Sequence, residues 1–303
     1  MHKYTAKIAI LLLLLSAFLV APEPGASAYY NAHNWHRNPC DNLKGGSWVF
    51  IPGDTYWTNS FCVMKFEAKN VSSVPTSQAS GVPWVGPTQP QALSYCQSLG
   101  ANYGLVTNLQ RMVLATHLAA QPTNWTGGSV GSGKMYTGHS DNNPASACQG
   151  SDDPTLAFVQ STCTPATQGT STLETRRIHY TSAGDVIWDV AGNVHEWLDY
   201  YNLSSHPTPL LMVSPYWQQY TAMSGTTTMP KSHLVPTNAV KSWWTDTWNS
   251  TQGVGNIMTL DNSKYGYGMM GGAFDNGANV GLFAFIFQES TMTFAGFRCT
   301  YNL

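Results

Sequence analysis

Residues 188–199 of the chain read Trp-Asp-Val-Ala-Gly-Asn-Val-His-Glu-Trp-Leu-Asp. Two carboxylates, Asp189 and Glu196, bracket a Gly-Asn turn in this stretch, and a tryptophan adjoins each of them. A tight loop of this composition can direct both carboxylates and several backbone carbonyls at one point, an arrangement that suits Ca²⁺. The other interpretation is a turn whose Asp and Asn side chains bond their own backbone. The pattern alone leaves both open.

The segment before this loop predicts a β-hairpin. Residues 177–188 alternate polar and apolar side chains in two runs, and Ser182-Ala183-Gly184-Asp185 separates the runs. Alternation on both sides of a Gly-containing turn is typical of two antiparallel strands. We therefore expect the chain to leave a strand at Trp188 and enter the loop directly.

The stretch resembles the D-x-x-G-N-V-x-E-W signature of the formylglycine-generating enzyme family, also called the sulfatase-modifying factor family. Other segments resemble motifs of that family in the same order along the chain. These are Phe-Cys-Val-Met-Lys-Phe-Glu-Ala at 61–68, Ala-Leu-Ser-Tyr-Cys-Gln-Ser-Leu-Gly at 92–100, Tyr-Gly-Leu-Val-Thr-Asn at 103–108, Gly-Gly-Ala-Phe at 271–274 and Gly-Phe-Arg-Cys at 296–299. The resemblance spans residues 47–303. It implies an α+β, C-type-lectin-like fold, rich in loops, with two helices and short antiparallel sheets.

The start of the chain predicts export. Lys3 and Lys7 precede an apolar run from Ile8 to Val20, and Ala26-Ser27-Ala28 forms a small-residue cleavage site. This is the pattern of a signal peptide over residues 1–28, and the run is too short for a confident membrane span. We therefore expect an N-terminal arm at 29–46, one domain at 47–303, no transmembrane segment, and a secreted or exported location at the cell surface, in the periplasm or outside the cell.

The composition argues against nucleic acid as a partner. Charged residues make up 10% of the chain and the formal net charge is -2. Soluble domains usually contain about 25% charged residues, and nucleic-acid binding requires a basic field that replaces counterions.

Six cysteines fit an oxidising compartment. Their spacings contain no CxxC zinc pattern, so disulfides are the better interpretation, and six cysteines allow 15 pairings. The resemblance implies that Cys96 and Cys299 join the first helix to the last strand. Cys148 and Cys163 flank one local loop and should pair, and Cys40 and Cys62 remain.

Two helices are expected. Thr88 caps the first, with Pro90 in its first turn and Gly100 closing it. The second begins near Thr107 or Asn108 and ends before Pro122.

Strands are expected at 47–51 and 61–67, with a Ser/Pro-rich loop at 70–86. Phe283, Phe285 and Phe287 alternate as in a half-buried strand. A buried Arg298 would need a carboxylate partner, and Glu67 is one candidate.

The resemblance also implies that the chain has a calcium site and lacks the copper site of the family's oxidases. It assigns one structural Ca²⁺ to the side chains of Asp189 and Glu196 and to the backbone carbonyls of Gly192 and Val194. The oxidases of the family hold copper through a cysteine pair, whose thiolates suit Cu(I). The corresponding segment 272–281 contains no cysteine, so we expect neither copper nor the oxidase reaction.

Three further groups of residues invite a functional interpretation. Asp141, Asp152 and Asp153 form either a second Ca²⁺ site or, as we prefer, solvated turns. His195 is expected to be a packed histidine. Three tryptophans within 243–248 form either core or an exposed platform for a ligand.

Some relatives bind ligands with the segment before Gly-Phe-Arg. The chain is thus expected to be an exported, non-catalytic binding or adhesion protein for a surface protein or a glycan. The alternatives are a sulfatase-modifying oxidoreductase and a structural subunit of a surface assembly. The candidate ligand contacts are Trp243, Trp244, Trp248, Phe274, Asp275, Asn276, Asn279, Phe285 and Gln288.

Overall fold

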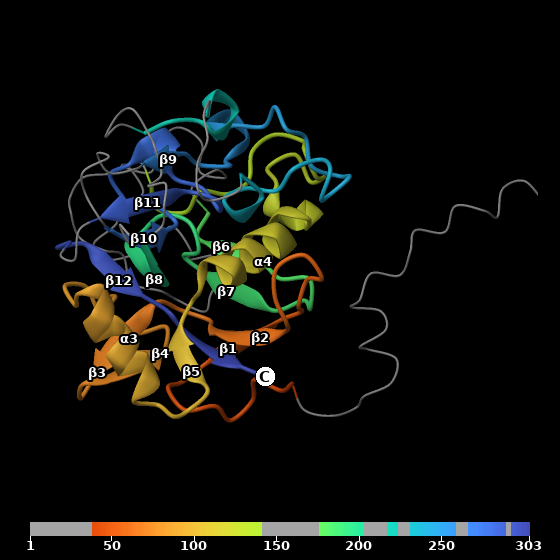
Figure 1. Ribbon diagram of the computed structural model, residues 1–303. Coiled ribbons are helices and arrows are strands. Elements are labelled where there is room, and N and C mark those ends of the chain that lie inside the picture. The colour runs from red at the N-terminus through yellow and green to blue at the C-terminus, as the bar shows by residue number, and fades with distance from the viewer. Residues whose placement is uncertain (1–37, 141–175, 203–216, 224–230, 259–265, 289–291) are drawn as a thin grey trace, which may run out of the picture. The chain divides into compact units, whose positions relative to one another are not determined.

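A computed structural model describes residues 38–140, 176–202, 217–223, 231–258, 266–288 and 292–303 (Figure 1). Residues 37–303 form one compact unit. The described residues form an α+β fold with two α-helices and several mostly antiparallel sheets. No helix in these ranges is long and apolar enough to cross a membrane.

The first sheet joins the two ends of the unit. Its strand order is β1-β2-β13-β5, and every pairing is antiparallel. The last strand of the chain therefore lies between strands from its first half (Figure 1). The strands are β1 (Trp48–Ile51), β2 (Phe61–Met64), β5 (Tyr103–Leu105) and β13 (Cys299–Asn302).

The second sheet has the order β12-β8-β10-β11-β9. Two pairings at its edges, β12 with β8 and β11 with β9, are parallel. Only Arg298 separates β12 from β13, so this residue lies where the chain passes from the second sheet to the first. The strands are β8 (His195–Asn202), β9 (Ile257–Met258), β10 (Gly266–Met270), β11 (Phe285–Gln288) and β12 (Ala295–Phe297).

The remaining described strands form two antiparallel hairpins. The expected hairpin is confirmed as β6 (Ile178–Tyr180) and β7 (Val186–Trp188). A second hairpin, β3 (Ala68–Val71) and β4 (Val74–Ser77), lies where the sequence predicted a loop. Ser72 and Ser73 form its two-residue turn with φ of 52° and 66°. Such turns usually contain Gly, Asn or Asp, so a Ser-Ser pair gave no signal.

Both predicted helices are confirmed, and Thr88 caps the first as expected. Thr88 caps α3 (Gln89–Gln97) in a capping box with Gln91, and Thr107 caps α4 (Asn108–Ala119) in a capping box with Gln110. In each box the threonine oxygen accepts an orphan amide of the first turn, and the glutamine accepts the amide of the cap. Short 3-10 turns lie at Pro122–Asn124, Tyr220–Ala222, Lys231–His233, Ser250–Gln252 and Gly277–Asn279.

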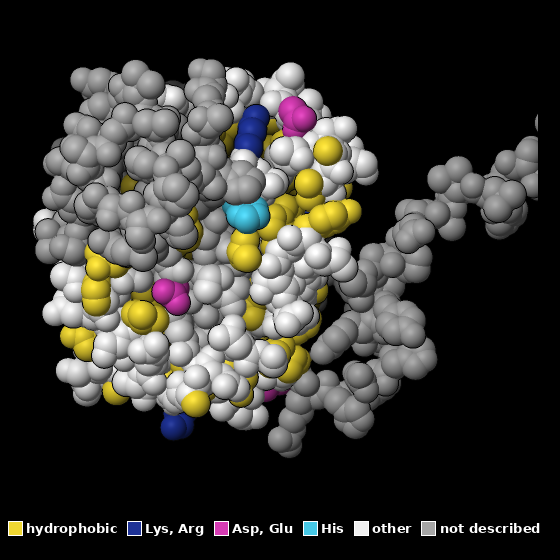
Figure 2. Space-filling model, in the orientation of Figure 1, with side chains coloured by type: hydrophobic (Ala, Val, Ile, Leu, Met, Phe, Trp, Pro, Cys, Tyr) yellow, Lys and Arg dark blue, Asp and Glu magenta, His cyan; other side chains and the backbone are white. Residues whose placement is uncertain are grey.

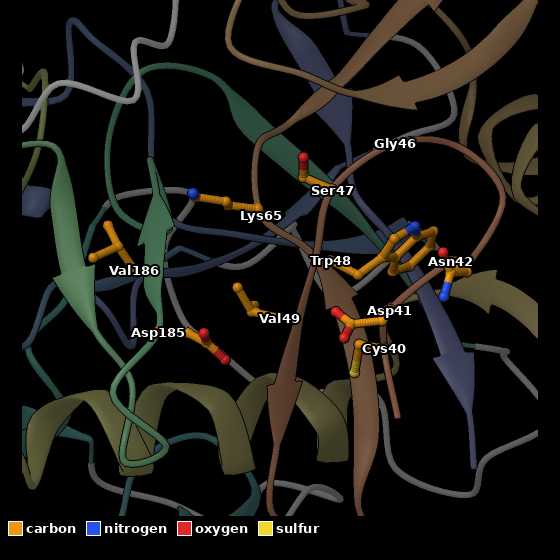
Figure 3. Close-up of a pocket in the computed structure, with 10 residues that line it drawn as sticks. All are labelled: Cys40, Asp41, Asn42, Gly46, Ser47, Trp48, Val49, Lys65, Asp185 and Val186. Carbon is orange, nitrogen blue, oxygen red and sulfur yellow. The ribbon is translucent and has the colours of Figure 1, made fainter. Parts of the chain in front are cut away.

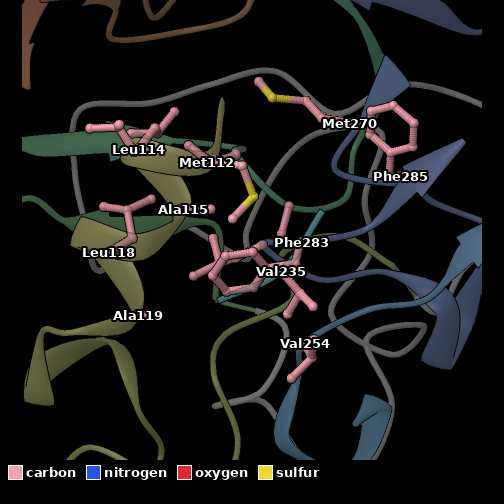
Figure 4. Close-up of a cluster of buried hydrophobic side chains, with 14 of the residues drawn as sticks. Met112, Leu114, Ala115, Leu118, Ala119, Val235, Val254, Met270, Phe283 and Phe285 are labelled. Carbon is pink, nitrogen blue, oxygen red and sulfur yellow. The ribbon is translucent and has the colours of Figure 1, made fainter. Parts of the chain in front are cut away.

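Both faces of strand β11 are buried from Phe285 to Phe287, and the prediction of a half-buried strand was wrong. The side chains of Phe285 and Phe287 lie in the largest hydrophobic cluster. Figure 4 shows Phe285 in this cluster with Met112 and Leu118 of α4. Ile286 packs into a second cluster on the other face of the strand. Since both faces meet apolar partners, alternation along β11 separates two cores rather than core from solvent.

Two predicted disulfides are formed, Cys40–Cys62 and Cys96–Cys299. The first ties the N-terminal arm to β2. The second closes a loop of sequence separation 203 between α3 and β13, which stabilises by about 5 kcal/mol on the chain-entropy model. Cys148 and Cys163 lie outside the described residues, so their pairing stays a prediction.

Candidate functional site

The loop between β7 and β8 is interior. Residues 188–198 are all buried. The loop reverses through three residues with positive φ, namely Asp189 at 55°, Gly192 at 78° and Asn193 at 66°. A Cβ on Gly192 would lie 2.4 Å from the carbonyl oxygen of His139. Only glycine therefore allows this close approach, and the loop is wedged against the 137–139 segment.

Glu196 and Arg298 form a buried ion pair. Arg298 Nη2 lies 2.6 Å from Glu196 Oε1, and Arg298 Nε lies 2.9 Å from Oε2. The guanidinium also donates to the carbonyls of Met64 and Trp188. This corrects the expectation that Glu67 would be the partner. Strand β12 runs parallel to β8 with Gly296 opposite Glu196, which brings the following Arg298 to Glu196.

Asp189 forms a second buried ion pair, with Arg177. Arg177 Nε donates to Asp189 Oδ1 and Nη2 donates to Oδ2, both at 2.6 Å. The two residues lie opposite each other at the open end of the β6–β7 hairpin, where the Asp189 amide donates to the Arg177 carbonyl. A bidentate pair of this kind fixes the geometry at the start of the loop.

Glu67 and Lys69 complete a buried charge cluster. Glu67 accepts hydrogen bonds from the Asn193 amide group and from the Val194 N–H. Burial, and then the charge of Asp189, raises the pKa of Glu67 to about 8. Burial lowers the pKa of Lys69. The cluster contains three acidic and three basic side chains, all buried: Glu67, Asp189, Glu196, Lys69, Arg177 and Arg298.

The cluster does not fit the predicted calcium ion. Arginines bind both carboxylates of the predicted site, so a calcium ion would have to displace them. No group of three or more His, Cys, Asp or Glu side chains among the described residues is arranged to hold a metal. Asp141, Asp152 and Asp153 lie outside those residues. Calcium at Asp189 and Glu196 therefore stays a prediction that requires its own test.

Chelation tests the calcium prediction. Since arginines satisfy both carboxylates, we expect EDTA to leave the melting temperature of the wild-type protein unchanged. An ion that binds only the folded state at a hundredfold excess over Kd would stabilise it by about 2.7 kcal/mol. Scanning calorimetry with EDTA and with added Ca²⁺ distinguishes the two cases. A melting temperature that falls with EDTA and recovers with Ca²⁺ would restore the calcium site.

Three buried histidines surround the loop. Burial lowers the pKa values of His139, His179 and His195 to about 4 each. His179 Nε2 lies 3.0 Å from the Tyr136 carbonyl oxygen, and the His139 ring stacks on Phe274. His195 is 1% exposed, which agrees with the packed histidine that the sequence predicted. All three are neutral in the folded protein at neutral pH.

Most of the predicted ligand surface is interior. Trp244 is buried, and half-buried Trp243 and Trp248 pack against the same core. Phe274 and Phe285 are also buried, so their side chains cannot reach a ligand. Charged side chains are sparse on the face shown in Figure 2.

The remaining polar positions of that surface are only partly available. Asp275 is exposed, and Gln288 is half-buried. The side chains of Asn276 and Asn279 accept hydrogen bonds from the Ala273 amide and the Asn256 side chain, so they brace the local backbone. Asp275 is the most accessible of the candidate contacts in this segment.

A polar hollow lies elsewhere, between β1 and the β6–β7 hairpin (Figure 3). Its volume is about 260 Å³. No local pattern in the sequence indicates this hollow, because its walls come from three separate segments of the chain. The lining residues are Cys40, Asp41, Asn42, Gly46, Ser47, Trp48, Val49, Lys65, Asp185 and Val186.

The polar side chains at one wall of the hollow are not used to hold the fold. Among the described residues, no hydrogen bond involves the side chains of Asp41, Asn42 or Ser47. Asp185 on the opposite wall has a raised pKa, chiefly because of burial. Uncommitted polar groups around a concave surface are the usual means of orienting a ligand.

A serine–histidine contact was also missed from the sequence. Ser182 Oγ lies 3.1 Å from His117 Nδ1. The nearby carboxylate of Asp54 forms an ion pair with Lys241 and accepts the Tyr56 amide. It therefore does not orient the imidazole as the acid of a catalytic triad does.

Comparison with known proteins adds no relative to this description. No family model matches the chain, and no curated protein matches it.

Proposed function

We propose that this chain is an exported, non-catalytic binding protein on a C-type-lectin-like scaffold similar to that of formylglycine-generating enzymes. The observation that carries the proposal is the polar hollow, whose Asp41, Asn42 and Ser47 side chains have no structural bonds among the described residues. The two disulfides support a location outside the reducing cytoplasm. The signal-peptide pattern at 1–28 supports the same location.

The buried charge cluster supports binding over catalysis. Its two arginines are paired with Asp189 and Glu196, and the bonds of Arg298 to the Met64 carbonyl and to Glu196 hold the β7–β8 loop against β2. The rival oxidase needs a thiolate pair for copper. Cys40, Cys62, Cys96 and Cys299 are all used in disulfides, and no described cysteine is free.

The proposal is tested by binding of the purified protein to a glycan array and to intact cells. We expect saturable binding that Asp41→Ala weakens at least tenfold. Asp275→Ala is the matched control, because it removes an exposed carboxylate from the other candidate surface. Both variants should keep the wild-type melting temperature, since neither carboxylate supports the core.

Three results would contradict this assignment. Loss of binding in Asp275→Ala alone would place the ligand on the 274–288 segment. Copper-dependent conversion of a sulfatase-derived cysteine peptide to formylglycine would restore the oxidoreductase. Assembly into large regular oligomers without any ligand would favour a structural subunit.

A further inference from the structure

The hollow lies against an open edge of the first sheet. Strand β1 is at the end of the strand order, and among the described strands it pairs with β2 alone. The Lys65 amide donates to the Ser47 carbonyl. Because backbone bonds alternate along an antiparallel pair, Val49 also bonds β2, whereas the N–H and C=O of Trp48 and Phe50 point away from it.

The opposite wall is a second strand edge. Asp189 N–H donates to the Arg177 carbonyl and Thr181 N–H donates to the Asp185 carbonyl. The same alternation makes Ile187 the residue of β7 that bonds β6. The backbone groups of Val186 and Trp188 therefore point away from β6, toward β1 and β2.

The gap between these edges is closed at both ends. At one end the Trp188 amide donates to the Lys65 carbonyl. At the other end the carboxylate of Asp185 accepts the Phe50 amide, an interaction that lowers its pKa against the effect of burial. Between the ends, no backbone bond among the described residues uses the outward groups of Trp48 or Val186.

The charges in the gap favour a cation. Asp41 and Asp185 carry two negative charges, and Lys65 carries one positive charge. The Asp41 charge raises the pKa of Asp185 and the Lys65 charge lowers it, which places all three groups within electrostatic reach. The Lys65 side chain points toward β7 (Figure 3).

We propose that the hollow binds the ammonium-bearing end of a short extended peptide segment, whose main chain bonds the outward backbone groups of Trp48 and Val186. This inference rests on the proposed function and names its ligand class. Outward N–H and C=O groups at two strand edges complement another main chain, which is the basis of recognition by strand addition. The ammonium group belongs either to a chain amino terminus or to a lysine side chain. A volume of about 260 Å³ admits a few residues at most.

The test is a titration of the ¹⁵N-labelled protein with defined probes, followed by the amide resonances of Trp48 and Val186. The probes are Ala-Val-Ala amide, its N-acetyl form, N-acetyl-Ala-Lys-Ala amide and glucosamine. We expect one of the two ammonium-bearing peptides to shift both resonances and to bind at least tenfold more tightly than acetylated Ala-Val-Ala amide. The peptide that binds identifies the source of the ammonium group.

Two variants connect the binding to the hollow. Asp41→Asn should weaken binding of the ammonium-bearing peptide severalfold, whereas Asp275→Asn should not change it. Val186→Pro removes one outward N–H at a position that does not bond β6, so it should weaken every peptide while the melting curve shows that the fold remains.

Two results would overturn the inference. If glucosamine binds as tightly as the peptides, the hollow recognises amines without a main chain, and the protein remains a binding protein. If no probe shifts Trp48 or Val186, the peptide assignment fails. The binding of the Asp41→Ala variant to cells then decides separately whether the proposed function fails with it.

Discussion

Replacing Arg298 by methionine will destabilise the protein by about 3–5 kcal/mol, because the substitution leaves the buried carboxylate of Glu196 without its counter-charge. Both side chains are almost fully buried, at 0% and 1% exposure. The guanidinium also satisfies the carbonyls of Met64 and Trp188, which would lose their donors. Urea denaturation of wild type and variant measures the difference in the free energy of unfolding.

The double variant Arg298→Met with Glu196→Gln is the matched control. It removes both charges, so it should recover part of the loss, and the remaining cost is that of the unpaired carbonyls. Arg298→Lys keeps the charge without the bidentate geometry and should lie between wild type and Arg298→Met. A loss below about 1 kcal/mol for Arg298→Met would show that the pair contributes no more than an exposed salt bridge.

Lowering the pH from 6.5 to 4 will destabilise the protein through its three buried histidines. Burial lowers the pKa values of His139, His179 and His195 to about 4, from an ordinary value of 6.5. Between these values the unfolded chain binds protons at the three sites and the native protein does not, so stability falls as the pH falls. Each proton contributes up to about 1.4 kcal/mol per pH unit.

Glu67 opposes this effect. Its pKa is raised to about 8, so between pH 4.5 and 8 the native protein holds a proton that the unfolded chain has released. This stabilisation is present at low pH and is lost as the pH rises. Burial also raises the pKa values of Glu196, Asp185 and Asp199, which act in the same direction as Glu67, and lowers those of His117 and His233, which act in the same direction as the other histidines. The slope of stability with pH is the sum of these opposed contributions, so the contribution of one histidine is measured by removing it.

Urea denaturation at pH 7, 6 and 5 measures this slope. His195→Phe should lower the slope by about one proton, because His195 is fully buried and its lowered pKa results from burial alone. His233→Gln is the control, since His233 lies nearer the surface in a short 3-10 turn, and it should change the slope much less. A slope that is equal in wild type and His195→Phe would mean that this histidine is protonated in the folded protein.

The local elements could be predicted from the sequence because their signals lie within a few residues of one another. The pairs Thr88–Gln91 and Thr107–Gln110 each contain both side chains of a capping box, which accepts free backbone amides at the start of a helix. The 182–185 turn between two alternating runs likewise contains the information for the β6–β7 hairpin. The resemblance led to the Cys96–Cys299 disulfide because it relates motifs at the two ends of the domain.

Only the tertiary structure decided which distant groups became partners. The sequence of the 188–199 stretch shows two carboxylates without their partners, and the fold brings Arg177 to Asp189 and Arg298 to Glu196. Alternation along β11 could not show that both of its faces are covered, because one strand contains no information about the layer behind it. The hollow between β1 and β7 depends on two strand edges that remain apart. Such a gap is a property of packing between segments, and no short stretch of the chain encodes it.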